Sequence, residues 1–241
     1  MNMDISPLWI SLKVAFTSTF ITFFTGIFFA RLIKSMKRFR FIPDCLLTLP
    51  MVLPPTVVGF FLLIIFGKNS SVGSLLESIG LRVVFTWQGA VIAAIVVSFP
   101  IMYRSALSAF DQVDSELIDA AKTLGFGEAA IFFKVWIPLS WPGLAAGAIL
   151  SFARALGEFG ATIMIAGNLP GKTRTMSVAV YTAMQSGNRQ AAYMWVILIL
   201  GMSVVTLLIM NYWSSRQYNK EDGSGRKHTV YIKLEENQKD R

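Results

Sequence analysis

The sequence predicts an all-α, polytopic membrane protein with five transmembrane helices, and three observations support this fold class. The 241 residues are 54% hydrophobic and only 15% charged, and their mean hydropathy is +0.56. Such a balance is typical of chains that reside in lipid. Five apolar stretches also reach the roughly 20 residues that a spanning helix needs. They run over residues 9–33, 46–66, 83–103, 142–166 and 193–213.

The first stretch is too long for a signal-peptide core and follows no basic run, so we expect a retained helix. Short basic loops stay in the cytoplasm during insertion. The basic run after this stretch therefore places the N-terminus outside and the C-terminus in the cytoplasm, although Lys172, Arg174 and Arg189 weakly oppose this topology. The run comprises Arg31, Lys34, Lys37, Arg38 and Arg40.

We expect one membrane domain over residues 7–216 and a short polar cytoplasmic tail over 217–241, which is too short to fold alone. The net charge of +8 needs no nucleic-acid partner, because much of it flanks the spans and faces anionic lipid. Cys45 and His228 are the only residues of their kinds, which leaves no disulfide framework and no His/Cys metal cluster.

Prolines dominate the second stretch. Pro50, Pro54 and Pro55 must break or kink this helix. A membrane tolerates the freed carbonyl groups only where protein or a water-filled path satisfies them. Thr56, beside the break, is therefore a candidate pathway hydroxyl, unless the prolines serve only to shape the helix.

The cytoplasmic loop over residues 104–141 joins the third and fourth stretches and predicts two short helices. Asp114 can cap the first helix and Gly125 can end it, with acidic residues early and Lys122 late, as the helix dipole favours. A second helix is expected over 128–136, ended by Pro138.

The first of these helices is amphipathic. Leu117, Ala121 and Leu124 share one face, and the small Ala120 and Ala121 allow another surface to approach closely. Taken by its shape alone, the loop is equally consistent with a docking element and with an ordinary connector on the membrane surface.

The fourth stretch places Arg154 near its middle, where a charge is costly unless it faces protein or water. Glu158 lies one turn later on the same face. The two form either an ion pair that fastens this helix to a neighbour or part of a polar translocation wall. Small residues recur every four positions, which predicts two buried faces. These rows are Gly143, Gly147, Ser151 and Ala155, and Ala153, Gly157 and Ala161.

The spacing within the cytoplasmic loop resembles the EAA loop of the permease subunits of ABC importers, with conservative departures. The matching positions are Asp119, Ala120, Ala121, Gly125, Val135, Ile137 and Pro138. The resemblance implies a type I ABC importer permease fold and a coupling helix that contacts a cytoplasmic ATPase. It further implies two such ATPases, an external binding protein and a second copy of the chain. A twofold pair is also expected because five helices are few to enclose a path.

Three segments, 53–59, 157–162 and 167–175, resemble the molybdate branch of these permeases. The resemblance implies molybdate import across the cell membrane, with tungstate or sulfate and thiosulfate as alternatives. Candidate pathway residues are Arg154, Glu158, Thr56, Gly157 and Gly160. Lys172 and Arg174, outside, could steer an anion, meet the delivering protein, or be solvated charges at the membrane boundary.

The run Gly167 to Thr173 is no phosphate-binding P-loop, because only three residues separate its glycines and it follows a membrane span. We therefore expect no cofactor on this chain, and ATP only in the partner ATPase. A membrane-embedded enzyme is disfavoured, because the spans contain no histidine and no evident metal or nucleophile set. A scaffold or receptor would not need Arg154 within the membrane.

Overall fold

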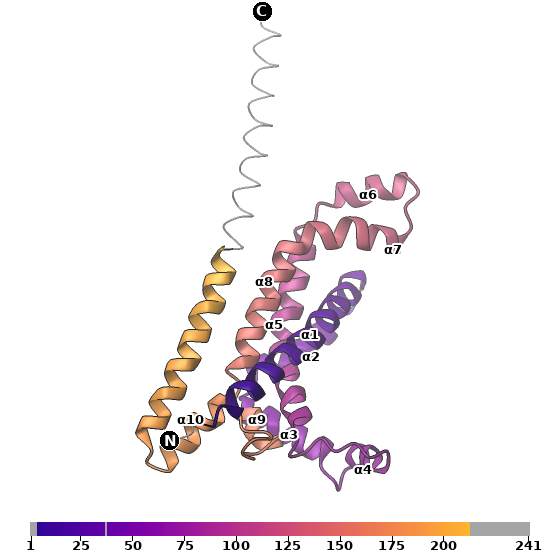
Figure 1. Cartoon of the computed structure of the whole chain (residues 1–241). Helices are drawn as coiled ribbons and strands as arrows, with labels where there is room; N and C mark the ends of the chain where they lie inside the picture. Colours follow the sequence, from indigo (N-terminus) through magenta and orange to yellow (C-terminus); the bar gives the residue numbers. More distant parts are fainter. Residues whose placement is uncertain (1–3, 37, 213–241) are drawn as a thin grey trace, which may run out of the picture. The chain divides into compact units, whose positions relative to one another are not determined.

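The computed structural model describes residues 4–36 and 38–212, and every regular element in those ranges is a helix (Figure 1). Residues 1–203 form one compact unit, and a second begins at Val204. Lys37 of the predicted basic loop, Trp213 of the last predicted span and the predicted tail 217–241 lie outside the described residues.

Four helices of the described chain are long and apolar enough to cross a membrane, and a bent pair makes a fifth candidate. The predicted all-α membrane fold is confirmed, and the count is five where the bent pair forms one span. The four are α1 (Ser6–Ser35), α5 (Trp87–Asp111), the run Glu128–Leu156 and the helix Arg189–Tyr212. The shorter helices are α4 (Ser71–Ser78), α6 (Ser115–Thr123), α9 (Gly160–Ile165) and α10 (Met176–Gln185).

The bent pair consists of α2 (Phe41–Val52) and α3 (Pro55–Phe66), which meet at an angle of 111°. Leu53 and Pro54 between them have extended backbone. Pro55 is well placed as the first residue of α3, because that position has no backbone hydrogen bond to lose. The predicted break at the prolines is confirmed.

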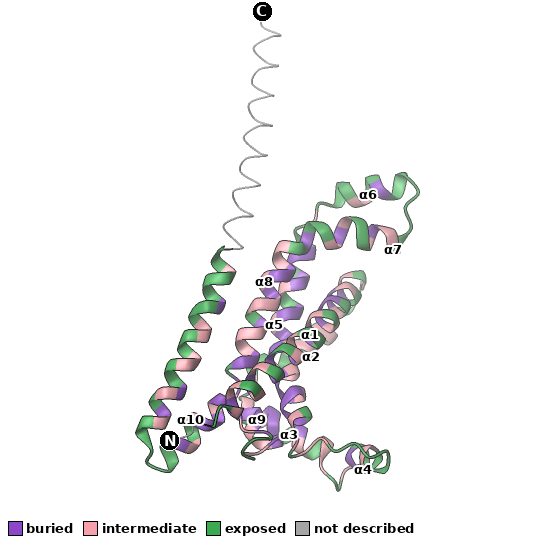
Figure 2. Cartoon of the chain, in the orientation of Figure 1, coloured by how far each residue is buried: buried purple, intermediate pink, exposed green. Residues whose placement is uncertain are grey.

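Helix α5 is the central element of the compact unit. It packs against both α1 and α8 (Ile137–Leu156), which also contact each other (Figure 1). Of its most apolar 18 residues, 61% are buried, the largest share among the candidate spans (Figure 2). Small residues make this packing close: a Cβ on Gly26 of α1 would lie 2.7 Å from Met102 Cγ. Close packing of this kind gives van der Waals contacts that hold helices together, because lipid supplies no hydrophobic driving force between them.

The first predicted row of small residues lies at the contact between α8 and α5. A Cβ on Gly143 would lie 2.6 Å from Ala109 Cβ, and one on Gly147 would lie 2.5 Å from Ser105 Cβ. Ser151 and Ala155 continue the row and are buried. This predicted buried face is therefore confirmed.

The fourth span ends earlier than the sequence predicts. Helix α8 stops at Leu156 rather than at Ala166, and the separate helix α9 begins at Gly160. Gly157 is the C-cap of α8 and is exposed. The second predicted row of small residues is therefore interrupted, and its predicted burial is wrong at Gly157. Glycine favours a helix end here, because it is less stable inside a helix than any residue except proline.

Pro138 does not end the helix that precedes it. The chain continues from α7 (Glu128–Ile131) through one π-helical stretch, η1 (Phe132–Trp136), into α8. The Ile137 N–H bonds to the Phe132 carbonyl, five residues back. Such a widened turn changes the hydrogen-bond register just where proline supplies no N–H. The predicted stop at Pro138 is therefore wrong, and the helix runs on as a span.

Candidate functional site

The loop between α5 and α8 carries α6, whose ends are set by two residues that the sequence predicted. Asp114 is the N-cap, and its Oδ1 accepts a hydrogen bond from the Glu116 N–H at 2.9 Å. Gly125 follows the last turn with a φ of +80°, a conformation that favours glycine. Glu116 in the first turn and Lys122 in the last complement the helix dipole.

Most of α6 is exposed, and Ala121 anchors the helix to the rest of the chain. Ala121 is buried in the apolar cluster beneath the helix. Leu117 and Leu124 are 50% and 77% exposed, and Asp119 and Ala120 are exposed as well. Another surface can therefore approach through Ala120 but not through Ala121, which the chain itself covers. The exposed leucines form an apolar surface that only a partner can bury.

The later residues of the predicted loop motif lie where α7 and η1 lead into α8. Val135 and Ile137 are half-buried, and Pro138 is exposed. Trp136 between them is 4% exposed and packs edge-on against Phe110 of α5, with ring centroids 5.2 Å apart. The base of the loop is thus tied to the core of the compact unit.

Two cations from the end of α1 hold this base. Arg31 forms an ion pair with Glu128 at 2.7 Å, and its guanidinium lies 4.8 Å from the centroid of the Trp136 ring. Lys34 lies over the same ring at 4.8 Å and pairs with Asp111 at 2.8 Å. These two residues served only as a topology signal in the sequence. Their contacts were not predicted, because the partners lie 77 and 97 residues away.

Arg154 lies in the last turn of α8, next to the break between α8 and α9. Its Nη1 donates to Glu158 Oε2 at 2.7 Å. Glu158 Oε1 accepts a second hydrogen bond, from the Ala161 N–H at 2.8 Å, and thereby caps α9. Glu158 is 2% exposed and its charge is satisfied within the chain, whereas the Arg154 side chain is 32% exposed.

The structure brings three more predicted pathway residues to this break. A Cβ on Gly160 would lie 3.1 Å from the Thr56 nitrogen, so the start of α9 lies directly against the start of α3. One on Gly59 would lie 2.7 Å from Ala161 Cα, which extends the same contact. Thr56 and Gly157 are both exposed beside it. The two helix breaks, far apart in sequence, therefore form one cluster.

An acidic residue that the sequence reasoning missed joins α2 to α5. Asp44 Oδ1 accepts a hydrogen bond from the Tyr103 hydroxyl at 2.7 Å, and Arg104 approaches Oδ2 at 3.3 Å. Tyr103 has no exposed surface. A lone acid at the start of an apolar stretch was the available signal, because a charge there requires a partner.

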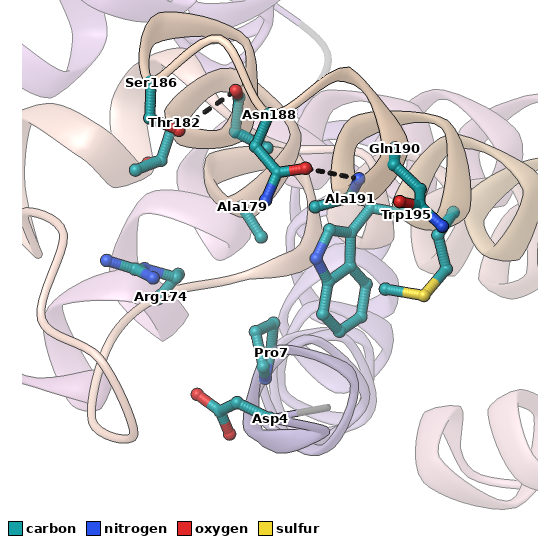
Figure 3. A pocket seen from close by; sticks show the side chains of 12 residues that line it. Asp4, Pro7, Arg174, Ala179, Thr182, Ser186, Asn188, Gln190, Ala191 and Trp195 are labelled. Atoms are coloured by element: carbon teal, nitrogen blue, oxygen red, sulfur yellow. Dashed lines mark hydrogen bonds between the residues drawn. The ribbon is translucent and has the colours of Figure 1, made fainter. Parts of the chain in front are cut away.

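The loop after α9 orients Arg174 by a chain of hydrogen bonds. Arg174 Nε donates to Asn168 Oδ1 at 2.7 Å, and Asn168 Nδ2 contacts Thr182 Oγ1 at 2.9 Å. Arg174 lines an open pocket of about 620 Å³, with Asp4 also on its wall (Figure 3). The Ser6 hydroxyl and the Ser6 N–H, which donates to Oδ1 at 2.9 Å, lower the pKa of the Asp4 carboxyl, and Arg174 adds a smaller effect. This pocket therefore carries both signs of charge. Lys172, two residues earlier, lines a different pocket.

The sequence matches known transport proteins over most of its length. Residues 22–217 match the family described as binding-protein-dependent transport system inner membrane component. The molybdenum transport system permease protein ModB of Escherichia coli (strain K12) is 41% identical over 86% of this chain and 91% of its own. The corresponding protein of Haemophilus influenzae is 38% identical, over 92% and 98%. The sulfate transport system permease protein CysT of E. coli is 35% identical, over 85% and 76%.

Solved structures share the fold at lower sequence identity. A bacterial alginate ABC transporter in complex with a pentasaccharide-bound periplasmic protein has a chain that matches with a TM-score of 0.72 at 18% identity, covering 90% of this chain and 80% of that one. A chain of the MetNI methionine ABC transporter, in an inward-facing conformation, matches with a TM-score of 0.66 at 17% identity, over 88% and 95%. The arrangement of helices is therefore that of ABC transporter membrane subunits.

Proposed function

The chain belongs to the family of binding-protein-dependent transport system inner membrane components, and on that basis we propose that it is the permease subunit of an ATP-driven molybdate importer. The observation that carries the substrate is the 41% identity to a molybdenum permease across 91% of that protein. The sulfate permease of the same organism is less similar, at 35% identity, and the match covers only 76% of that protein. Tungstate, sulfate and thiosulfate are the alternative substrates.

The exposed surface of α6 is the proposed contact for a separate cytoplasmic ATPase. Leu117 and Leu124 supply apolar area, and Asp119, Ala120 and Gly125 lie on or beside the same short helix. Movement of α6 would pass to the core through buried Ala121 and through the Trp136 base. ATP is bound and hydrolysed in that partner, and this chain itself is not an enzyme.

At the break between α8 and α9, Arg154 is the proposed contact for the oxyanion, and Glu158 is its positioning residue. Glu158 uses both oxygens within the chain, while the partly exposed Arg154 donates to it through only one nitrogen. Thr56, Gly157 and Gly160 complete the wall. Because Glu158 already accepts a hydrogen bond from Arg154, the site binds a dianion weakly enough for release, as transport requires.

We expect Arg154→Gln to reduce uptake at least about tenfold, because it removes the proposed anion contact while retaining a hydrogen-bond donor. Assembly with the ATPase, measured by co-purification, should persist. Arg154→Lys is the matched control and should retain part of the uptake. Normal assembly with normal uptake in Arg154→Gln would exclude a pathway role for this residue.

The full importer would contain two copies of the chain around a twofold axis, two ATPases and an external binding protein. In the proposed topology the N-terminus lies outside, α6 lies in the cytoplasm, the permease domain covers residues 7–216 and the tail over 217–241 is cytoplasmic. Alternating access follows: ATP binding closes the ATPases, their movement reaches the spans through α6, and the oxyanion released by the binding protein crosses.

Uptake into vesicles tests this function directly. Vesicles that contain the chain, its ATPase and its binding protein should accumulate radioactive molybdate only when ATP is supplied on the ATPase side. Unlabelled molybdate or tungstate in excess should suppress the signal more strongly than sulfate. A stronger effect of sulfate would make sulfate the substrate. If no oxyanion accumulates in the vesicles even when ATP is supplied, the chain would instead be a scaffold.

A further inference from the structure

Two lysines that lie far apart in the sequence line one pocket at the end of the unit away from α6. Lys13 comes from the third turn of α1, and Lys172 comes from the loop after α9. The pocket is open, measures about 360 Å³, and is also lined by Thr86 and Trp87 at the start of α5 and by Thr173. No acidic side chain lines it.

Neither lysine has a carboxylate within 4 Å among residues 4–36 and 38–212. Lys13 instead places its Nζ 3.7 Å from the centroid of the Trp87 ring. It is also the only charged residue of α1 before Arg31. An ionised group inside an apolar span is costly unless a water-filled site or a ligand satisfies it. The open pocket supplies such a site for Lys13.

The pocket favours an anion in two further ways. Helix α5 begins there, with Thr86 as its N-cap, so the partial positive charge of a 25-residue helix adds to that of the lysines. Thr173, which is fully buried, uses its Oγ1 to accept a hydrogen bond from the Leu169 N–H at 3.0 Å. This bond fixes the turn of the loop that carries Lys172.

The neighbouring pocket shows what this one lacks. There Arg174 shares the wall with Asp4, a carboxylate at neutral pH. A dianion would be attracted by one group and repelled by the other. The loop thus turns Arg174 toward a wall of mixed charge and Lys172 toward a wholly cationic one. Free anions should collect at the second.

We propose that Lys13 and Lys172, with Trp87 beside them, form a binding site for a tetrahedral oxyanion group. The group is either a free dianion of the molybdate or sulfate type or the phosphate of a lipid headgroup. A free dianion bound here would lie at the end of the unit away from α6, which is the outer end in the proposed topology and the end at which import would begin. That role rests on the proposed function, whereas the binding site itself does not.

Equilibrium binding of radioactive molybdate to the permease–ATPase complex, in nanodiscs of phosphatidylcholine and without binding protein, tests the first source. The double variant Lys13→Gln, Lys172→Gln should bind at this site at least about tenfold more weakly, because two charge contacts are lost. The double variant Lys13→Arg, Lys172→Arg should bind as the parent does. Lys68→Gln is the matched control, because it removes an exposed lysine from a different pocket of the same unit.

Nanodiscs that contain phosphatidylglycerol test the second source. If a lipid phosphate is the ligand, native mass spectrometry should show phosphatidylglycerol retained by the parent and by the arginine variant, and lost from the glutamine variant. Either result, loss of molybdate binding or loss of phosphatidylglycerol from the glutamine variant, supports the site. Equal retention of molybdate and of phosphatidylglycerol by the parent and the glutamine variant would overturn it. Because the assay measures binding and not uptake, a failed transport experiment would leave this outcome unaffected.

Discussion

Two ion pairs between residues close in sequence, one on α6 and one at the break between α8 and α9, have opposite surroundings. Lys122 and Asp119 of α6 lie 3.4 Å apart with side chains 52% and 74% exposed. Arg154 and Glu158 lie 2.7 Å apart, and Glu158 is 2% exposed. The first pair is surrounded by water, and the second holds two helix ends together. Similar sequence spacing, three residues in the first pair and four in the second, therefore says little about the structural weight of a charge pair.

The apolar side chains around the two pairs differ in the same way. Leu117 on α6 and Leu124 at its C-cap are 50% and 77% exposed. At the break, by contrast, Gly59 and Ala161 bring α3 and α9 so close that an added methyl group would clash. The α6 surface is thus open to the proposed partner, whereas the break is completed within the chain. Loss of the exposed leucines at α6 should affect assembly, and loss of Glu158 at the break should affect the fold.

The largest effect is expected for Glu158→Gln, which leaves Arg154 without its counter-ion and weakens the cap of α9. Removal of one partner of a buried pair costs about 3–5 kcal/mol, and the partial exposure of Arg154 reduces this to about 2 kcal/mol. The thermal midpoint in nanodiscs should fall by about 4–8 °C. Glu128→Gln, which alters an ion pair with a 73% exposed carboxylate, is the control. Equal midpoints for the two variants would contradict the structural role of Glu158.

A second substitution, Leu124→Ser, should leave the thermal midpoint unchanged and weaken association with the ATPase about tenfold. The reason is that a 77% exposed leucine contributes apolar area only when a partner covers it. Titration of the purified ATPase against nanodiscs measures this affinity. Leu75→Ser in α4, at the other end of the unit, removes a leucine of similar exposure and should have no effect. A loss of affinity in both variants would mean that α6 is not the docking surface.

The smallest effect is expected for Lys122→Gln. An exposed pair three residues apart on a helix contributes less than about 0.5 kcal/mol, and the helix dipole adds a comparable amount. Neither the unfolding equilibrium constant nor the dissociation constant for the ATPase should change by more than about fivefold. A large loss of affinity would show that Lys122 contacts the ATPase directly and would sharpen the boundary of the docking surface.

Local features of the chain were predictable because they depend on neighbours in sequence. The caps of α6 at Asp114 and Gly125 follow from side-chain and backbone preferences of single residues. The break at Pro54 follows from the missing N–H of proline. The ends of the helices were less predictable, because residues that favour and residues that oppose a helix lie together at these positions. At Gly157 an apolar run continued past a residue that ended the helix, and at Pro138 a π-helical stretch carried the helix onward.

The sequence by itself determined the class of protein, the approximate position of its apolar spans, and the resemblance that pointed to an importer. Tertiary structure alone decided which charges meet: Asp44 with Tyr103, Arg31 with Glu128, and Lys13 with the pocket of Lys172. Hydrophobic length and helix caps act over a few residues, so they can be read along the chain. Ion pairs and pockets join segments tens of residues apart, and only the packing of α1, α5 and α8 brings them together.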